Sequence, residues 1–254
     1  FGNRLFLSKG EGAWNQRQQQ KDVILAGWAW GCTSADFDLD GRIDVYVANG
    51  LESRQSVRDY ESEYWLHDAF LADSEKDSDA YLYFKQKFER TRGQGMSYGG
   101  YESNRLFLGT LNGTELDVAP LWHVGPQWDA RNVGSADFDQ DGRQDLVFTH
   151  FETWPDARQV LRVYLNRIPR QGNWIGFRPK RGAGIPSSLG LQIQVEAGGM
   201  SRVATLTSGD SYRTQHPSVI HFGLGETQRV DQATIRWPDG TQETLGGMGI
   251  NQYV

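Results

Sequence analysis

The stretch SADFDLDGRIDVYVANG, at positions 34–50, returns in nearly the same form as SADFDQDGRQDLVFTH at positions 135–150. Each copy carries four aspartates on one grid, and the second grid begins 101 positions after the first. Four carboxylates that lie this close together repel one another unless a cation neutralises them. Ca²⁺ takes six to eight oxygen ligands, and acidic loops with a glycine at a sharp turn commonly supply them. We therefore expect two calcium ions, one at each grid, and the expected side-chain ligands are Asp36, Asp38, Asp40, Asp44, Asp137, Asp139, Asp141 and Asp145.

The glycine and the arginine that follow the third aspartate complete the predicted site. Gly41 and Gly142 stand where the chain must bend tightly, because a Cβ there would be costly. Arg42 and Arg143 follow them, and we expect each to contribute its backbone carbonyl to the ion while its side chain points outward. The alternative is an acidic solvated turn that binds no metal.

The grids are not EF-hands. That motif needs an acidic residue at its twelfth position, where the two copies have Val47 and Phe148. The residues that follow each loop alternate between apolar and polar types, which is typical of a β-strand. Each loop is therefore predicted to join two strands of a hairpin.

A wider duplication surrounds the loops. NRLFL occurs at 3–7 and again at 104–108, which is the same offset of 101, and RVYLN at 162–166 is a weaker third copy. Matches at one offset indicate a duplicated structural unit. We expect four antiparallel strands in a unit, near residues 28–35, 43–49, 104–108 and 115–119, and this arrangement is typical of a propeller blade.

Residues 51–103 interrupt the first unit as a largely helical insertion. Two short amphipathic helices are predicted there, followed by a glycine-rich return; their apolar positions are Val57, Tyr60, Tyr64 and Leu71 in one and Tyr81, Phe84 and Phe88 in the other. Gly95, Ser97 and Gly99 match the serine-hydrolase pattern G-x-S-x-G, but the strand and helix that this pattern requires are missing around them. The five histidines are scattered and are expected to pack or to form hydrogen bonds.

The aspartate, glycine and strand pattern resembles the FG-GAP or VCBS repeat of integrin-alpha-type β-propellers, in which the carboxylate loop holds calcium. From about Asn173 the sequence changes, and HFGLG at 221–225 and IRWPDG at 235–240 resemble the ASPIC/UnbV domain of cartilage-acidic-protein-like chains. The resemblance implies an all-β chain. Residues 1–172 would form propeller blades, and residues 173–254 would form a small β-sandwich-like domain.

Composition limits the classes of function. The net charge of −6 does not indicate the basic surface that binds nucleic acid. No apolar run is long enough for a transmembrane segment. Millimolar calcium outside cells would fill even weak sites, so we expect a secreted, periplasmic or cell-surface location. The beginning of the sequence resembles the middle of a repeat, and few blades are present, so association with further blades or another chain is expected.

Two functions fit these observations. The first is a non-catalytic calcium-binding recognition or scaffold module whose partner is a protein or a glycan. The alternative is an enzyme, or a subunit of an enzyme complex, with a site at the propeller face. A carboxylate of raised pKa beside a histidine in a pocket would favour the enzyme.

Overall fold

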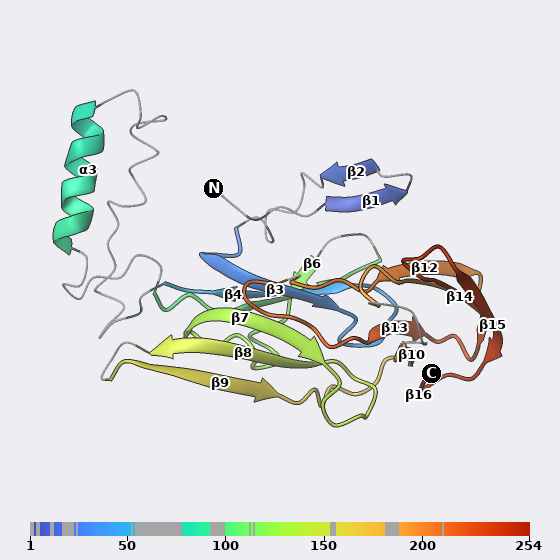
Figure 1. Cartoon of the computed structure of the whole chain (residues 1–254). Coiled ribbons are helices and arrows are strands. Elements are labelled where there is room, and N and C mark those ends of the chain that lie inside the picture. Colours follow the sequence, from blue (N-terminus) through green and yellow to red (C-terminus); the bar gives the residue numbers. More distant parts are fainter. Residues whose placement is uncertain are drawn as a thin grey trace.

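The computed structural model describes residues 3, 6–10, 13–16, 23, 25–51, 53, 78–91, 100–111, 113, 115–152, 156–180, 188–209 and 211–254. Apart from one helix, the named elements are β-strands arranged in five sheets (Figure 1). No helix among these residues has the length and apolar character needed to cross a membrane.

The first repeat unit forms a four-stranded antiparallel sheet in the order β3-β4-β5-β6. Its strands are β3 (Ala29–Ala35), β4 (Asp44–Asn49), β5 (Arg105–Gly109) and β6 (Glu115–Asp117). The prediction of four antiparallel strands in the first unit is confirmed. The central strand β4 is buried along almost its whole length, because apolar clusters cover both faces of the sheet.

The second unit repeats the first three strands. The order is β7-β8-β9, formed by β7 (Asp129–Ala136), β8 (Asp145–Glu152) and β9 (Arg158–Tyr164). A separate hairpin of β1 (Phe6–Gly10) and β2 (Ala13–Gln16) corresponds, at the offset of 101, to β5 and β6. The duplication seen in the sequence is therefore also a duplication of strands.

The two repeat sheets pack on each other through a shared apolar core. Tyr46 of β4 and Phe148 of β8 meet there with ring centroids 6.3 Å apart. At the first strands, the Thr33 hydroxyl of β3 lies 2.9 Å from the Ser135 hydroxyl of β7. Equivalent strands of the two copies thus lie side by side, so the loops that follow β3 and β7 emerge at the same end of the pair.

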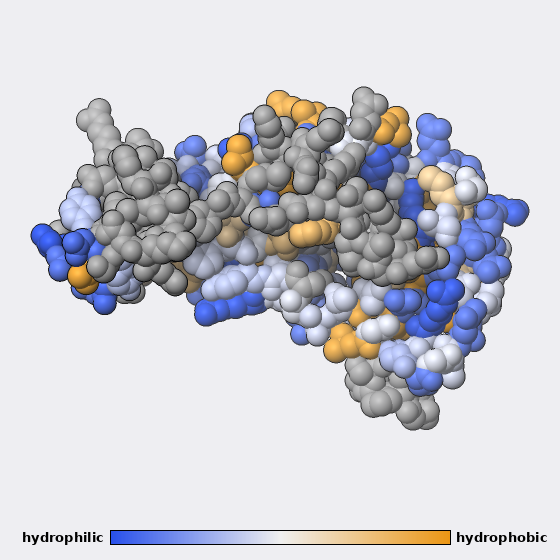
Figure 2. Space-filling model, turned by 90° about the horizontal axis from the view of Figure 1, so that it is seen from above, coloured by the Kyte–Doolittle hydropathy of each residue, from blue (hydrophilic) through white to orange (hydrophobic). Residues whose placement is uncertain are grey.

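The C-terminal region has its own core between two further sheets. One has the order β13-β10-β16 and the other the order β12-β11-β14-β15. The strands are β10 (Asn173–Phe177), β11 (Gln192–Ala197), β12 (Met200–Thr205), β13 (Ile220–Gly225), β14 (Val230–Arg236), β15 (Gln242–Met248) and β16 (Gln252–Tyr253). Side chains alternate between the two faces of a strand, so each sheet turns one apolar face to the other. Ile193 and Val195 of β11 thus share one core with Ile175 and Phe222 of the other sheet. The outer surface of this region is largely hydrophilic (right side of Figure 2).

The insertion contains one described helix, α3 (Ser78–Thr91). Asp79 in its first turn and Arg90 in its last turn match the sign of the helix dipole. This confirms the second predicted helix, although Tyr81 is 48% exposed and does not serve as a core residue in the described surroundings. The first predicted helix, between Val57 and Leu71, and the pattern around Ser97 lie outside the described residues.

The described strands confirm an all-β chain with a small helical insertion. The sheets do not close into a ring within the described ranges. The propeller expected from the sequence is therefore not confirmed.

Candidate functional site

The two aspartate grids form turns of one geometry, which we call loop 1 (residues 36–44) and loop 2 (residues 137–145). Loop 1 connects β3 to β4, and loop 2 connects β7 to β8. Leu39 and Gln140 have φ values of 64° and 60°, and Gly41 and Gly142 both have 90°. The sharp turn predicted at the glycines is confirmed in both copies.

The fourth aspartate of each loop ties the turn to the third strand of its sheet. Asp44 and Asp145 are buried, and each carboxylate accepts two backbone N–H groups, one from the second residue of the loop and one from a residue at the end of the third strand or just after it. The donors are Phe37 (2.8 Å) and Gly109 (2.9 Å) for Asp44, and Phe138 (2.8 Å) and Asn166 (2.7 Å) for Asp145. The weak RVYLN copy at 162–166 contains Asn166, and this was the signal that could have revealed the contact.

The first aspartate closes the turn on itself. Asp36 Oδ2 accepts the Gly41 N–H at 2.7 Å, and Asp137 Oδ2 accepts the Gly142 N–H at 2.9 Å. Asn166 also joins the two loops, because its side-chain amide donates to the Phe37 carbonyl at 2.8 Å. The loops are therefore built alike and held next to each other.

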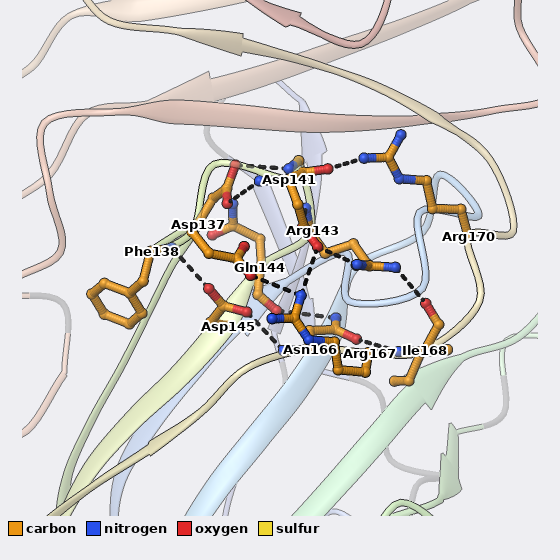
Figure 3. A network of polar contacts seen from close by, with 12 residues as sticks. Asp137, Phe138, Asp141, Arg143, Gln144, Asp145, Asn166, Arg167, Ile168 and Arg170 are labelled. Carbon is orange, nitrogen blue, oxygen red and sulfur yellow. Dashed lines mark hydrogen bonds and ion pairs between the residues drawn. The ribbon is translucent and has the colours of Figure 1, made fainter.

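The two arginines do not behave as predicted. We expected outward side chains, but the guanidinium of Arg42 pairs with Asp40. In loop 2 the guanidinium of Arg143 pairs with Asp141 (Figure 3). Their backbone N–H groups donate to the same carboxylates, at 2.8 Å and 3.0 Å. The reason is local: a cation two residues from an aspartate in a tight turn reaches that carboxylate more easily than it reaches solvent.

The loops bring carboxylate oxygens together in two groups. Within each group, one oxygen of each member lies within 4.8 Å of the others; the groups are Asp36, Asp38 and Asp40 in loop 1, and Asp137, Asp139 and Asp145 in loop 2. The predicted ligands Asp44 of loop 1 and Asp141 of loop 2 are not members of these groups. Three converging carboxylates are the donor set that a hard divalent cation prefers.

The electrostatics of loop 1 also fit a cation. Burial, reinforced by the neighbouring Asp44 carboxylate, raises the pKa of Asp36 to about 8, and burial raises the pKa of Asp44 to about 7. Burial also raises the pKa of Asp38 in the same loop and of Asp145 in loop 2. In addition, Asp36 Oδ1 is buried and accepts no hydrogen bond from any described residue. A buried, partnerless carboxylate oxygen is unusual, and a bound ion would satisfy it.

The described histidines are not brought together into one site. His150 is fully buried, stacks on Trp128 with centroids 4.4 Å apart, and bonds to Glu152 at 2.9 Å. His216 lies 2.8 Å from the Thr33 hydroxyl, and His67 lies outside the described residues. The described histidine contacts are packing and hydrogen-bonding contacts, as expected.

Comparison with known proteins links the C-terminal region to a family. Residues 183–254 match the family model described as ASPIC and UnbV. The chain is also similar to Cartilage acidic protein 1 of Xenopus tropicalis, with 25% identity over 94% of this chain and 38% of that protein. The human and mouse proteins of the same name are each 23% identical to this chain over 83% of its length. The matched region covers 33% of the human protein and 34% of the mouse protein. The chain thus spans between a third and two fifths of these relatives, and its C-terminal region is similar to the ASPIC and UnbV family.

Proposed function

We propose that this protein is a non-catalytic, calcium-binding recognition or scaffold module that acts outside the cytoplasm. Two Ca²⁺ ions would bind, one in loop 1 and one in loop 2, through the aspartate carboxylates and the backbone carbonyls of Arg42 and Arg143. The observation that carries this proposal is the repetition: two turns 101 residues apart share backbone angles, carboxylate hydrogen bonds and converging oxygens. A turn that needed no ion would have no reason to concentrate four acids twice.

The repeat sheets are proposed to be blades of an FG-GAP/VCBS β-propeller. In support, the first sheet is a four-stranded antiparallel meander, and the first strands β3 and β7 lie side by side as the inner strands of neighbouring blades do. The outer face of the second sheet carries apolar side chains in the open: Leu161 is 64% exposed and Val163 is 52% exposed. Such a face suits a further blade, from this protein or from another chain.

The partner is proposed to be a protein or a glycan, and the location secreted, periplasmic or cell-surface. Support comes from the similarity to Cartilage acidic protein 1 and from the fit of weak calcium loops to an environment rich in calcium. The alternative, an enzyme or a subunit of one, remains a prediction of the sequence.

Thermal unfolding in calcium and in EDTA tests the proposal. At a free calcium concentration of about one hundred times Kd, each occupied site adds about 2.7 kcal/mol to the free energy of unfolding. For a chain of this size, each kcal/mol raises Tm by about 2–4 °C. Wild type should therefore gain about 10 °C or more, and Asp38→Ala combined with Asp139→Ala should lose that gain. The charge-matched control, Asp156→Ala combined with Glu243→Ala at exposed positions, should keep it. An equal Tm of the wild type in calcium and in EDTA would reject the calcium sites.

A further inference from the structure

The C-terminal region reaches back to loop 2 through a cluster of three aromatic side chains. The Tyr253 hydroxyl of β16 donates to Asp137 Oδ2 at 2.6 Å, and His221 Nε2–H of β13 donates to the Gly142 carbonyl at 3.0 Å. The Trp174 ring of β10 packs directly on Gly142, where a Cβ would overlap the indole. Trp174 also stacks on His221, with ring centroids 5.2 Å apart. One predicted ligand and the sharp turn of loop 2 are thus both held by C-terminal residues.

The same region covers loop 1. Gly223 of β13 lies so close to the Asp36 carboxylate that a Cβ on this glycine would overlap it. The Arg202 guanidinium, which donates to the Gly223 carbonyl, lies beside Gly41. In the segment that leads into β10, the Gln171 N–H donates to the Asp38 carbonyl at 3.2 Å.

These contacts come mainly from one face of the sheet β13-β10-β16. Trp174 pairs with Gly223, and Gly176 pairs with both His221 and Tyr253, so all five residues point to the same side. The residues between them, such as Ile175 and Phe222, point into the C-terminal core. The sheet therefore has one face for its own core and one face for the two aspartate loops.

We propose that this sheet completes the two cation sites, so that calcium binding and the docking of residues 173–254 on the loops are coupled. The inference rests on the proposed calcium function and concerns the regulation of those sites. Without a cation, the sheet must cover carboxylates that repel one another, so docking is opposed. With a cation in each loop this repulsion is removed, and the sheet in turn shields the ion–carboxylate contacts from water and strengthens them. Such coupling is reciprocal: docking raises calcium affinity by the same factor by which calcium favours docking.

A single added methyl group tests the coupling at loop 1. Gly223→Ala changes no loop residue but inserts a Cβ against Asp36, whereas Gly246→Ala, on β15 of the other sheet, meets nothing within 4 Å. Calorimetric titration of the EDTA-stripped full chain with CaCl₂ should show one of two sites weakened about tenfold or more in Gly223→Ala. Gly246→Ala should bind like the wild type. Wild-type affinity at both sites in Gly223→Ala would overturn the coupling while leaving the calcium function intact, and a wild type that binds no calcium would overturn both.

Loop 2 and the wild-type protein supply tests that do not depend on how well Gly223→Ala folds. Tyr253→Phe should weaken the other site about fivefold, and Tyr81→Phe, on the exposed side of α3, should not. Hydrogen exchange of the wild type should slow on calcium addition at the amides of β10 and β13 as well as in the loops. Protection confined to the two loops, or equal calcium binding by Tyr253→Phe and wild type, would overturn the inference.

Discussion

Loop 1 and loop 2 share four aspartates, a backbone geometry and a set of amide hydrogen bonds, yet different neighbours surround them. In loop 1 the Asp36 and Asp44 carboxylates are buried, and their pKa values are raised to about 8 and about 7. In loop 2 burial also raises the pKa of Asp145, but at Asp141 the hydrogen bonds and charge of Arg143 outweigh burial and lower the pKa.

Cations of the protein itself explain much of this difference. Arg167 lies 2.8 Å from Asp139 and 3.2 Å from Asp141, and Arg170 bonds to the Asp141 carbonyl (Figure 3). Loop 1 has Arg42 and the half-buried Arg202 near it, whose own pKa is lowered by burial. The same motif can therefore depend on a metal ion to different degrees, according to how many side-chain cations stand beside it.

The largest expected effect is a dependence of stability on pH in EDTA, caused by loop 1. Below about pH 4 both the folded and the unfolded states hold the Asp36 proton. Between about pH 4 and 8 the unfolded chain releases this proton while the folded state keeps it, so the free energy of unfolding falls as pH rises towards 8. The loss from Asp36 alone is on the order of 5 kcal/mol, at about 1.4 kcal/mol per pH unit, and chemical denaturation at pH 5, 6, 7 and 8 would measure it.

Two variants decide which loop causes this pH dependence. Asp36→Asn should clearly reduce the slope in EDTA, because one of the two loop 1 carboxylates that keep an extra proton in the folded state is gone. Asp137→Asn should keep most of the wild-type slope, because Asp36 and Asp44 remain. The same slope in wild type and Asp36→Asn would contradict the assignment to loop 1.

The glycine at the sharp turn gives the next largest contrast. Alanine at Gly41 or Gly142 must adopt a φ of 90°, which costs about 1–2 kcal/mol in either loop. At Gly142 the added Cβ also overlaps the Trp174 ring, whereas at Gly41 it meets the flexible end of Arg202. Gly142→Ala should therefore lower the free energy of unfolding by about 2–4 kcal/mol, and Gly41→Ala by about 1–2 kcal/mol. Denaturant titration of both variants checks this, and an equal loss would show that the indole moves aside without cost.

The sequence predicts the strands and loop turns well, because their signals are local. Two loops of one geometry on equivalent strands were predicted from the aspartate grid, the glycine at the turn and the offset of 101. The roles of Tyr253, His221 and Gly223 could not be foreseen, because these residues approach the loops only after the C-terminal sheet has folded. The arginine side chains were predicted wrongly, because a carboxylate two residues away attracts each guanidinium.

The smallest expected effect concerns the exposed arginine of loop 2. Arg167→Gln frees Asp139 and Asp141 from a competing cation, so calcium affinity at loop 2 should rise. Because the Arg167 side chain is 61% exposed, the gain should be small, about two- to threefold at low salt, as for other solvent-exposed ion pairs. It should vanish near 1 M salt, where charges are screened within about 3 Å. Arg229→Gln, which removes a somewhat more exposed arginine paired with Asp231, is the control in the same calorimetric titration. A rise shared by both variants would mean that net charge, and not the position beside loop 2, controls the affinity.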